Sequence, residues 1–198
     1  WELSKTESVD VMDAQGCNIR IDARGNEVLR VLPRLHEDIN EEWISDKTRF
    51  ACDGLSRQRL DTPYVRAPDG KLKPTSWGEA FSAIATKLKD SGGEKIAAIA
   101  GDIIDVEAMF ALKGLMSALG STNIDCRQDG AKLNANSRAG YIFNSTIAGI
   151  DEADALLLVG TNPRLEAPVL NARIRKNWLY CNLPIVSIGA NGDFTYEY

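Results

Sequence analysis

The sequence predicts an α/β fold in which a small antiparallel β unit is followed by a parallel-sheet α/β domain. Near the N-terminus, apolar and polar residues alternate with a period of two on both sides of a glycine turn, which indicates a β-hairpin. From about residue 94, short apolar runs alternate with stretches of helical periodicity, which is typical of strand–helix–strand units. The apolar runs at 96–100, 155–159 and 185–188 each end directly at a glycine.

The front of the chain is expected to form the hairpin. Residues 18–22 alternate, Gly25 supplies the turn, and residues 28–32 return. Residues 8–11 form a further alternating stretch. Pro33 should end the second strand, because it has no N–H to give to the ladder.

A polar, charged segment follows at residues 36–49. We expect it to be a covering loop with one short helical turn, held down by Trp43 and Ile44. A connector rich in Pro, Asp and Gly extends over residues 57–75. Ser76 with Glu79 three positions later then forms a capping-box pattern, which predicts the start of a helix.

The remainder is expected to alternate between strand and helix. The predicted elements are a strand at 96–100, a helix capped by Asp105 and ended by Gly120, strands at 123–126 and 155–159, a helix at 168–179 and a strand at 185–188. Because the clearest strands are continuously apolar, we expect a parallel sheet covered on both faces. The predicted domain organisation is a β domain at 1–60, a connector with a helix at 61–93 and an α/β domain at 94–198.

The composition is that of an ordinary globular protein, with 44% hydrophobic and 26% charged residues. The net charge of −5 argues against nucleic acid as a partner, because phosphate binding needs a basic surface. No apolar run approaches the roughly 18 residues of a membrane span, so we expect no direct membrane insertion. The chain starts at Trp1 and stops at Tyr198, and both ends look like cuts in a longer protein.

The four cysteines are widely scattered, and none has Cys-x-x-Cys spacing. This pattern signals neither a zinc site nor a thioredoxin-type site. We expect reduced, buried thiols at all four positions, which are Cys17, Cys52, Cys126 and Cys181.

The segment Gly160-Thr161-Asn162-Pro163 lies between a predicted strand and a predicted helix. In open α/β sheets, ligands bind at the carboxyl ends of strands, and a glycine before a helix N-terminus lets the backbone approach a phosphate. Asn-Pro loops also occur merely to turn the chain. The position by itself therefore leaves a phosphate site and a simple turn both open.

Longer strings carry a family resemblance. Residues 151–164 and 166–175 resemble the dinucleotide-binding α/β domain of the molybdopterin oxidoreductases. Together with residues 7–13, 35–50 and 146–149, they are more closely similar to the large iron–sulfur subunit of respiratory complex I, the NADH-quinone oxidoreductase. The resemblance covers nearly the whole chain and implies a Rossmann-like domain of molybdopterin-oxidoreductase type, truncated at its C-terminus.

In the molybdopterin family, the front unit resembles a [4Fe–4S] holder with four cysteines. Laid on this chain, the four positions become Asp10, Asp13, Cys17 and Ser45, and Cys52 lies beyond the fourth of them. Such a cluster needs soft thiolate ligands, and three of the four are absent. We therefore expect a degenerate cluster domain without metal.

The strand-end loop Gly160–Pro163 is likewise expected to be vestigial, because no Cys or Ser is assigned as a molybdenum ligand. The resemblance then implies no catalytic residue and no cofactor in this fragment, with iron–sulfur clusters elsewhere in the parent chain. Arg173 and Arg175 are interpreted as solvated or interface charges.

The resulting hypothesis is a non-catalytic structural and docking part of the peripheral arm of NADH:quinone oxidoreductase (complex I), whose parent complex transfers electrons from NADH to quinone. Its partners would be other peripheral-arm subunits, on the cytoplasmic face of a bacterial inner membrane or the mitochondrial matrix side. One alternative is a fragment of an active molybdopterin-dependent oxidoreductase, with the pterin at the strand-end loop. Another is a degenerate cluster site that uses Cys17 with carboxylates.

Overall fold

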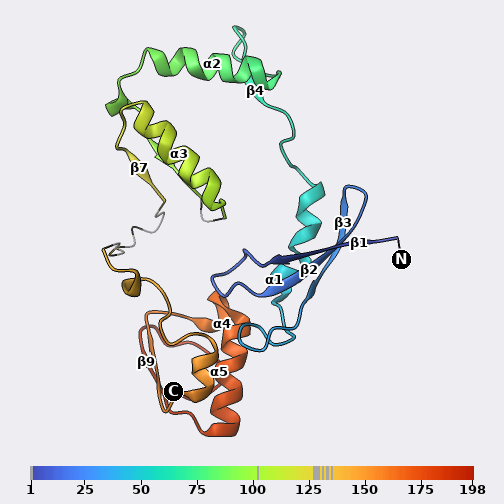
Figure 1. Ribbon diagram of the computed structural model, residues 1–198, viewed down its shortest axis with the longest axis vertical. Helices are drawn as coiled ribbons and strands as arrows, with labels where there is room; N and C mark the ends of the chain where they lie inside the picture. Colours follow the sequence, from blue (N-terminus) through green and yellow to red (C-terminus); the bar gives the residue numbers. More distant parts are fainter. Residues whose placement is uncertain (1, 102, 127–129, 131, 133, 135) are drawn as a thin grey trace. The chain divides into compact units, whose positions relative to one another are not determined.

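The computed structural model describes residues 2–101, 103–126, 130, 132, 134 and 136–198. The chain divides into two compact units (Figure 1). One unit combines Trp1–Arg57 with Leu133–Tyr198, and the other is Gln58–Lys132. Contacts thus group the last third of the chain with the first, whereas the sequence suggested three successive segments. The boundaries proposed at residues 60 and 93 stay predictions.

The first unit opens with a three-stranded antiparallel sheet in the order β1 (Ser4–Val9), β2 (Asn18–Arg24) and β3 (Glu27–Pro33). The predicted hairpin is confirmed. Gly25 turns the chain in the left-handed region, at φ +57°, where a side chain is disfavoured. β1 ends earlier than predicted, because the N–H of Asp10 turns away to the carbonyl of Cys17, at 2.8 Å.

An ion triad is built into this hairpin. Asp22 is fully buried and lies directly opposite Arg30 in the β2–β3 register. Its carboxylate accepts from Nε of Arg30 at 2.7 Å and from Nε of Arg20 at 2.8 Å. The two guanidinium groups hold the pKa of Asp22 below its ordinary value, mainly through the hydrogen bond from Arg20.

A helix α1 (Asp46–Phe50) and the 3-10 helix η1 (Ala51–Ser56) follow the covering loop. They close a small core whose buried members are Cys17, Ile19, Val31, Ile44 and Val169. Since Val169 comes from the C-terminal part of the chain, this core joins the front sheet to the α/β region.

The covering loop is not held down as expected. Ile44 is buried, but Trp43 is 56% exposed, so the predicted anchoring by Trp43 is wrong. The buried side chain of Asn40 fixes the loop instead. It accepts from the N–H of Asn18 at 2.9 Å and donates to three backbone carbonyls, one of them that of Trp43 at 3.1 Å.

The rest of the first unit is an α/β arrangement. Its elements are the 3-10 helices η3 (Arg138–Gly140) and η4 (Ala148–Glu152), the strands β8 (Leu156–Val159) and β9 (Ile185–Ile188), and the helices α4 (Pro163–Glu166) and α5 (Pro168–Cys181). β8 and β9 pair in parallel, as predicted. The buried core between the strands and α5 consists of Ile150, Leu158, Ile174, Leu183, Ile185, Phe194 and Tyr196.

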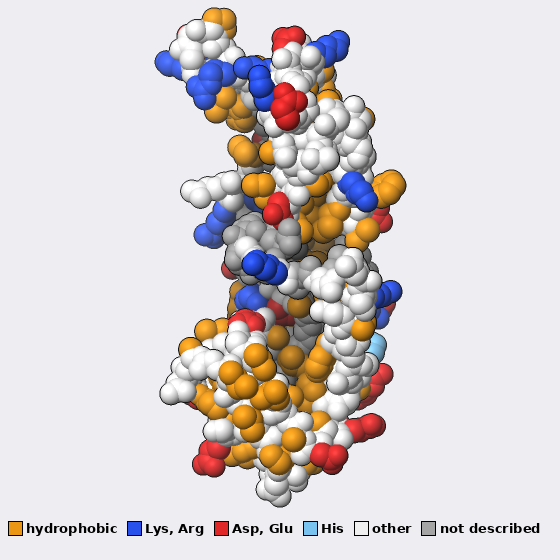
Figure 2. All heavy atoms as spheres, turned by 90° about the vertical axis from the view of Figure 1, so that its left-hand side faces the viewer, with side chains coloured by type: hydrophobic (Ala, Val, Ile, Leu, Met, Phe, Trp, Pro, Cys, Tyr) orange, Lys and Arg blue, Asp and Glu red, His pale blue; other side chains and the backbone are white. Residues whose placement is uncertain are grey.

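The expectation that these strands are buried on both faces is wrong for the described chain. Leu158 is buried, but its neighbours Leu157 and Val159 are 57% and 62% exposed. In β9, Val186 and Ile188 are similarly exposed. Helix α5 covers one face of the pair, and the other face presents hydrophobic side chains, which also show at the surface in the lower half of Figure 2.

The second unit carries the predicted capped helix and a parallel strand pair. Its elements are the strands β4 (Tyr64–Arg66), β5 (Leu72–Pro74), β6 (Ala98–Ile99) and β7 (Ile124–Asp125), the helices α2 (Trp77–Lys89) and α3 (Val106–Ala118), and the 3-10 helix η2 (Gly93–Lys95). β6 and β7 are parallel, as predicted, but shorter. The antiparallel pair β4–β5 lies in what we interpreted as a plain connector.

The cysteines only partly match expectation. All four are free, and Cys17 is buried, but Cys126 and Cys181 are exposed. Burial at all four positions was therefore a wrong prediction. Among the described residues, no helix has the length and apolarity needed to cross a bilayer.

The capping box of α2 gives a stability prediction. The Ser76 hydroxyl accepts from the N–H of Glu79, and the Glu79 carboxylate accepts from the N–H of Ser76 at 3.1 Å. Ser76→Ala should lower the free energy of unfolding by about 1 kcal/mol, measured by urea denaturation. Ser82→Ala, inside the same helix, is the control and should change it little, because its hydroxyl only back-bonds to the carbonyl of Gly78.

The ion triad gives a pH prediction. Because the pKa of Asp22 is lowered by folding, its contribution to stability is present above the ordinary pKa of 3.8 and is lost as the pH falls through the lower folded value. Asp22→Asn should therefore destabilise the chain at pH 7 and flatten the loss of stability below about pH 4, measured by urea denaturation across that range. Asp38→Asn, at an exposed acid, is the control. A steep acid profile that survives in Asp22→Asn would contradict the assignment.

Candidate functional site

The four predicted cluster positions are brought together around the first turn of α1. Asp10 follows β1 and Cys17 precedes β2, and the backbone hydrogen bond between them closes a tight loop. Ser45 is the N-cap of α1, where its hydroxyl accepts from the N–H of Thr48 at 3.3 Å. Asp13 reaches the same helix through Lys47, whose Nζ lies 3.7 Å from Oδ2 of Asp13.

A chain of hydrogen bonds links two of these positions. Oγ1 of Thr48 donates to Oδ2 of Asp10 at 2.5 Å and lies 2.9 Å from Oγ of Ser45. Because the only hydroxyl proton of Thr48 goes to the carboxylate, Ser45 donates to Thr48. Oδ1 of Asp10 also accepts from the N–H of Met12 at 2.9 Å. The carboxylate and both hydroxyls are therefore occupied within the protein.

Cys17 is the one thiol at the four positions, and it is 1% exposed. Burial raises the pKa of its thiol to about 12, and the nearby carboxylates of Asp13 and Asp10 act in the same direction. The side chain is therefore a neutral thiol at pH 7. It packs as a small hydrophobe against the core that contains Ile19 and Val169.

These residues do not fit a [4Fe–4S] cluster. The cluster requires thiolates, whereas the site offers one neutral thiol, two carboxylates and a hydroxyl that caps a helix. Cys52 does not complete the set, because its Sγ lies 3.8 Å from the carbonyl of Arg49 and packs at the edge of the core. Over the described part of the chain, no three His, Cys, Asp or Glu side chains are grouped to hold a metal ion.

The strand-end loop lies where the sequence placed it, at the carboxyl end of β8. Gly160 is left-handed, at φ +60°, and its N–H donates to the carbonyl of Ile188 at 2.7 Å. A Cβ added to Gly189 would lie 3.4 Å from the backbone of Gly160, so two glycines allow the ends of β8 and β9 to come close. Pro163 is the first residue of the unforeseen helix α4, not a residue of the turn ahead of the helix at 168.

An internal carboxylate fills the donor positions of this loop. Oε1 of Glu166 accepts from the N–H of Asn162 at 3.0 Å, and Oε2 accepts from the Thr161 hydroxyl at 2.6 Å. Oδ1 of Asn162 caps α4 by accepting from the N–H of Leu165 at 3.3 Å. A phosphate at the loop would have to displace the Glu166 carboxylate and would meet its negative charge. Sequence reasoning missed Glu166, although its distance of four residues from Asn162 was visible.

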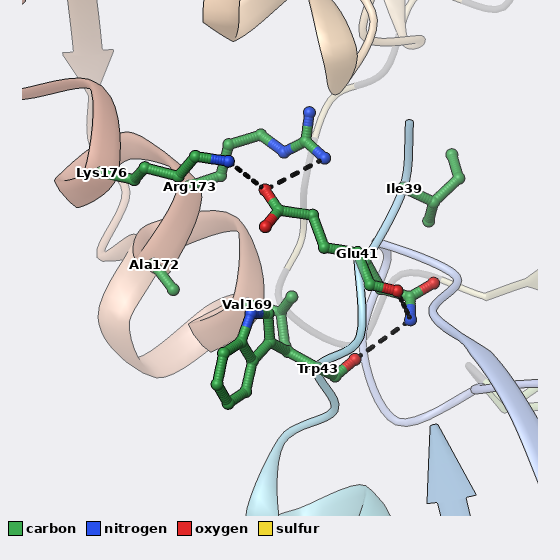
Figure 3. Close-up of a pocket in the computed structure, with 8 residues that line it drawn as sticks. Ile39, Glu41, Trp43, Val169, Ala172, Arg173 and Lys176 are labelled. Carbon is green, nitrogen blue, oxygen red and sulfur yellow. Dashed lines mark hydrogen bonds and ion pairs between the residues drawn. The ribbon is translucent and has the colours of Figure 1, made fainter. Parts of the chain in front are cut away.

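A second cluster, unforeseen in the sequence, lies between the covering loop and α5 (Figure 3). Arg173 is only 4% exposed, and its Nη1 donates to Oδ2 of Asp151 at 2.8 Å. Its Nη2 donates to the carbonyl of Glu37 and lies 3.6 Å from the Glu41 carboxylate. Lys176 shares that carboxylate at 2.8 Å. The interpretation of Arg173 as a solvated or interface charge is therefore wrong.

Comparison with known proteins gives the class of protein. Residues 59–198 match the family model described as molybdopterin oxidoreductase. Residues 3–53 match a model described as the NADH-ubiquinone oxidoreductase NDSU1/NuoG-like, 4Fe-4S domain. The chain belongs to the molybdopterin oxidoreductase family. The front unit is thus of an iron–sulfur domain type, although we expected no cofactor in this part of the protein.

Individual relatives narrow the likeness further. The chain is 54% identical to the mitochondrial NADH-ubiquinone oxidoreductase 78 kDa subunit of Candida albicans, over 100% of this chain and 28% of that protein. It is 52% identical to the mitochondrial NADH dehydrogenase [ubiquinone] iron-sulfur protein 1 of Solanum tuberosum, and 53% identical to an NADH-quinone oxidoreductase subunit of Rickettsia conorii, in each case over 100% of this chain and over 27% and 29% of those proteins. The resemblance inferred from the sequence strings is confirmed. The chain spans less than a third of each relative.

The neutral state of Cys17 gives a prediction for the site. Cys17→Ala should lower the free energy of unfolding by about 1–2 kcal/mol through lost packing, measured by urea denaturation. Cys181→Ala, at an exposed thiol, is the control and should have little effect. In the native chain at about pH 8, iodoacetamide should modify Cys126 and Cys181 well before Cys17, as read by mass spectrometry. Rapid alkylation of Cys17 in the folded chain would show that the thiol is ionised.

Proposed function

We propose that this chain is a non-catalytic structural and docking part of the peripheral arm of NADH:quinone oxidoreductase. The observation that carries the proposal is the closed state of the former cluster site. Asp10, Thr48 and Ser45 satisfy one another through hydrogen bonds, and the single thiol at the site is buried and neutral. A site in this state has no ligand to offer iron, so this part of the protein carries no electron relay.

The strand-end loop supports the same proposal. Residues Gly160–Pro163 keep the geometry of a dinucleotide site, but Glu166 occupies the donors that a phosphate would use. An enzyme of the molybdopterin type also needs an exit for electrons. With the cluster positions closed, a pterin at this loop would have none.

The relatives suggest where this part works. They are named as subunits of NADH-ubiquinone or NADH-quinone oxidoreductases, two of them mitochondrial and one bacterial. The proposed partners are accordingly other peripheral-arm subunits, on the matrix side in mitochondria or on the cytoplasmic face of a bacterial inner membrane. Electron transfer from NADH to quinone belongs to the parent complex, with iron–sulfur clusters elsewhere in the parent chain.

The alternative is a fragment of an active molybdopterin-dependent oxidoreductase. The match of residues 59–198 to the molybdopterin oxidoreductase model and the preserved turn at Gly160 favour it. Cofactor content separates the two functions, because the alternative requires molybdenum or tungsten with a pterin.

The decisive measurement is metal and pterin content. The purified chain should contain far less than one Fe, Mo or W per molecule by mass spectrometry of the elements, and denaturation should release no fluorescent oxidised pterin. Near-stoichiometric pterin or molybdenum would establish the alternative, and about four Fe per chain would establish a cluster.

A cysteine-restored variant is the matched control for this measurement. Asp10→Cys, Asp13→Cys and Ser45→Cys together supply four thiols at positions that the fold already brings to one place. Anaerobic reconstitution with iron and sulfide should load this triple variant and leave the unaltered chain empty. Equal loading of both would mean that other residues bind the iron.

A further inference from the structure

A small concave pocket lies in the first unit between the covering loop and the outer side of α5 (Figure 3). Its volume is about 210 Å³. The lining residues are Ile39, Asn40, Glu41, Trp43, Val169, Ala172, Arg173 and Lys176. None of them belongs to the former cluster site or to the strand-end loop.

The pocket has firm walls and an apolar floor. The Glu41 carboxylate lies between Lys176 and Arg173 and joins the loop to the helix, as Figure 3 shows. Below this ion cluster, the indole ring of Trp43 lies beside Val169 and leaves a hollow over α5. Because both cations are already paired within the protein, the pocket is not arranged to bind a free anion.

The exposure of Trp43 is the unusual feature. Its indole is 56% exposed although Val169 and the core lie next to it. Tryptophan is among the residues that most often dominate the energy of a protein interface, typically beside a pocket that receives a side chain of the partner. The volume is below the roughly 300 Å³ at which pockets for small molecules begin, and it suits a single apolar side chain.

The rim of the pocket is acidic. Asp38 precedes the lining residue Ile39, Glu42 precedes Trp43, and the backbone of Glu37 contacts Arg173. All three side chains are exposed, and none of them forms an ion pair with another described residue. Figure 2 shows carboxylates next to the single histidine of this loop. An uncompensated acidic rim favours a partner with positive charge.

We propose that this pocket docks a basic segment of another polypeptide, which inserts one apolar side chain beside Trp43 and places Lys or Arg residues against Glu37, Asp38 and Glu42. This inference rests on the proposed docking function and names the surface that performs it. The apolar anchor supplies most of the affinity, and the acidic rim sets the orientation and speeds association.

Photo-crosslinking in the assembled parent complex identifies the occupant. Trp43→p-benzoylphenylalanine is introduced into the full-length protein, and Trp77→p-benzoylphenylalanine, at a tryptophan that is 63% exposed in the second unit, is the control. The expected product joins position 43 to one short Lys- or Arg-rich segment of a different polypeptide. A product within the same polypeptide, with a second copy, or with an acidic or neutral segment would overturn the proposal, as would no product.

Binding measurements with a synthetic peptide of the cross-linked segment complete the test. Trp43→Ala and the pocket-filling Ala172→Phe should each weaken its binding at least about tenfold, whereas Trp77→Ala should not. Asp38→Lys with Glu42→Lys should slow association and reduce its dependence on salt. Unchanged binding in Trp43→Ala and Ala172→Phe, both checked for folding by circular dichroism, would reject the pocket.

The two proposals fail in different ways. If the parent complex assembles without metal or pterin in this region but position 43 meets no basic segment, the docking surface is wrong and the structural role stands. If the chain holds stoichiometric pterin or iron, the proposed function is wrong whatever position 43 contacts.

Discussion

The first unit depends on neutralising one buried charge, that of Arg173. Removing a guanidinium from water costs several kcal/mol unless acids and carbonyls surround it. Here Asp151, Glu41 and the carbonyl of Glu37 provide that surrounding. These partners lie on η4 and on the covering loop, so one side chain of α5 fixes the positions of two distant segments. The pocket at Trp43, the core around Val169 and the loop that leads to Ser45 all follow from this arrangement.

The former cluster positions show how the same backbone can be closed without metal ligands. A cluster holds its loops together through four thiolate bonds. In this chain, hydrogen bonds from Thr48 to Asp10 and from Ser45 to Thr48, with the contact of Lys47 and Asp13, join the loop after β1 to the start of α1. Each such bond is weak by itself, but all lie in a buried setting, where an unpaired polar group is costly.

The strand-end loop follows the same principle. A helix N-terminus after a parallel strand favours negative charge. The Glu166 carboxylate meets that preference from within the protein, through the N–H of Asn162 and the hydroxyl of Thr161. In both places a geometry suited to a cofactor is stabilised by side chains of the chain itself, which leaves surfaces such as the Trp43 pocket as the features open to partners.

The sequence by itself determined the local elements and the family. Alternation around Gly25, the Ser76–Glu79 capping box and the apolar run of β8 depend on neighbours within a few residues, and each appears in the structure. The burial of Arg173, the exposure of Trp43 and the open face of β8 were decided only by tertiary contacts. Arg173 meets Asp151 and Glu37 across 22 and 136 positions, and Lys176 meets Glu41 across 135. No local pattern encodes pairings over such separations, because which partners meet depends on how the whole chain packs.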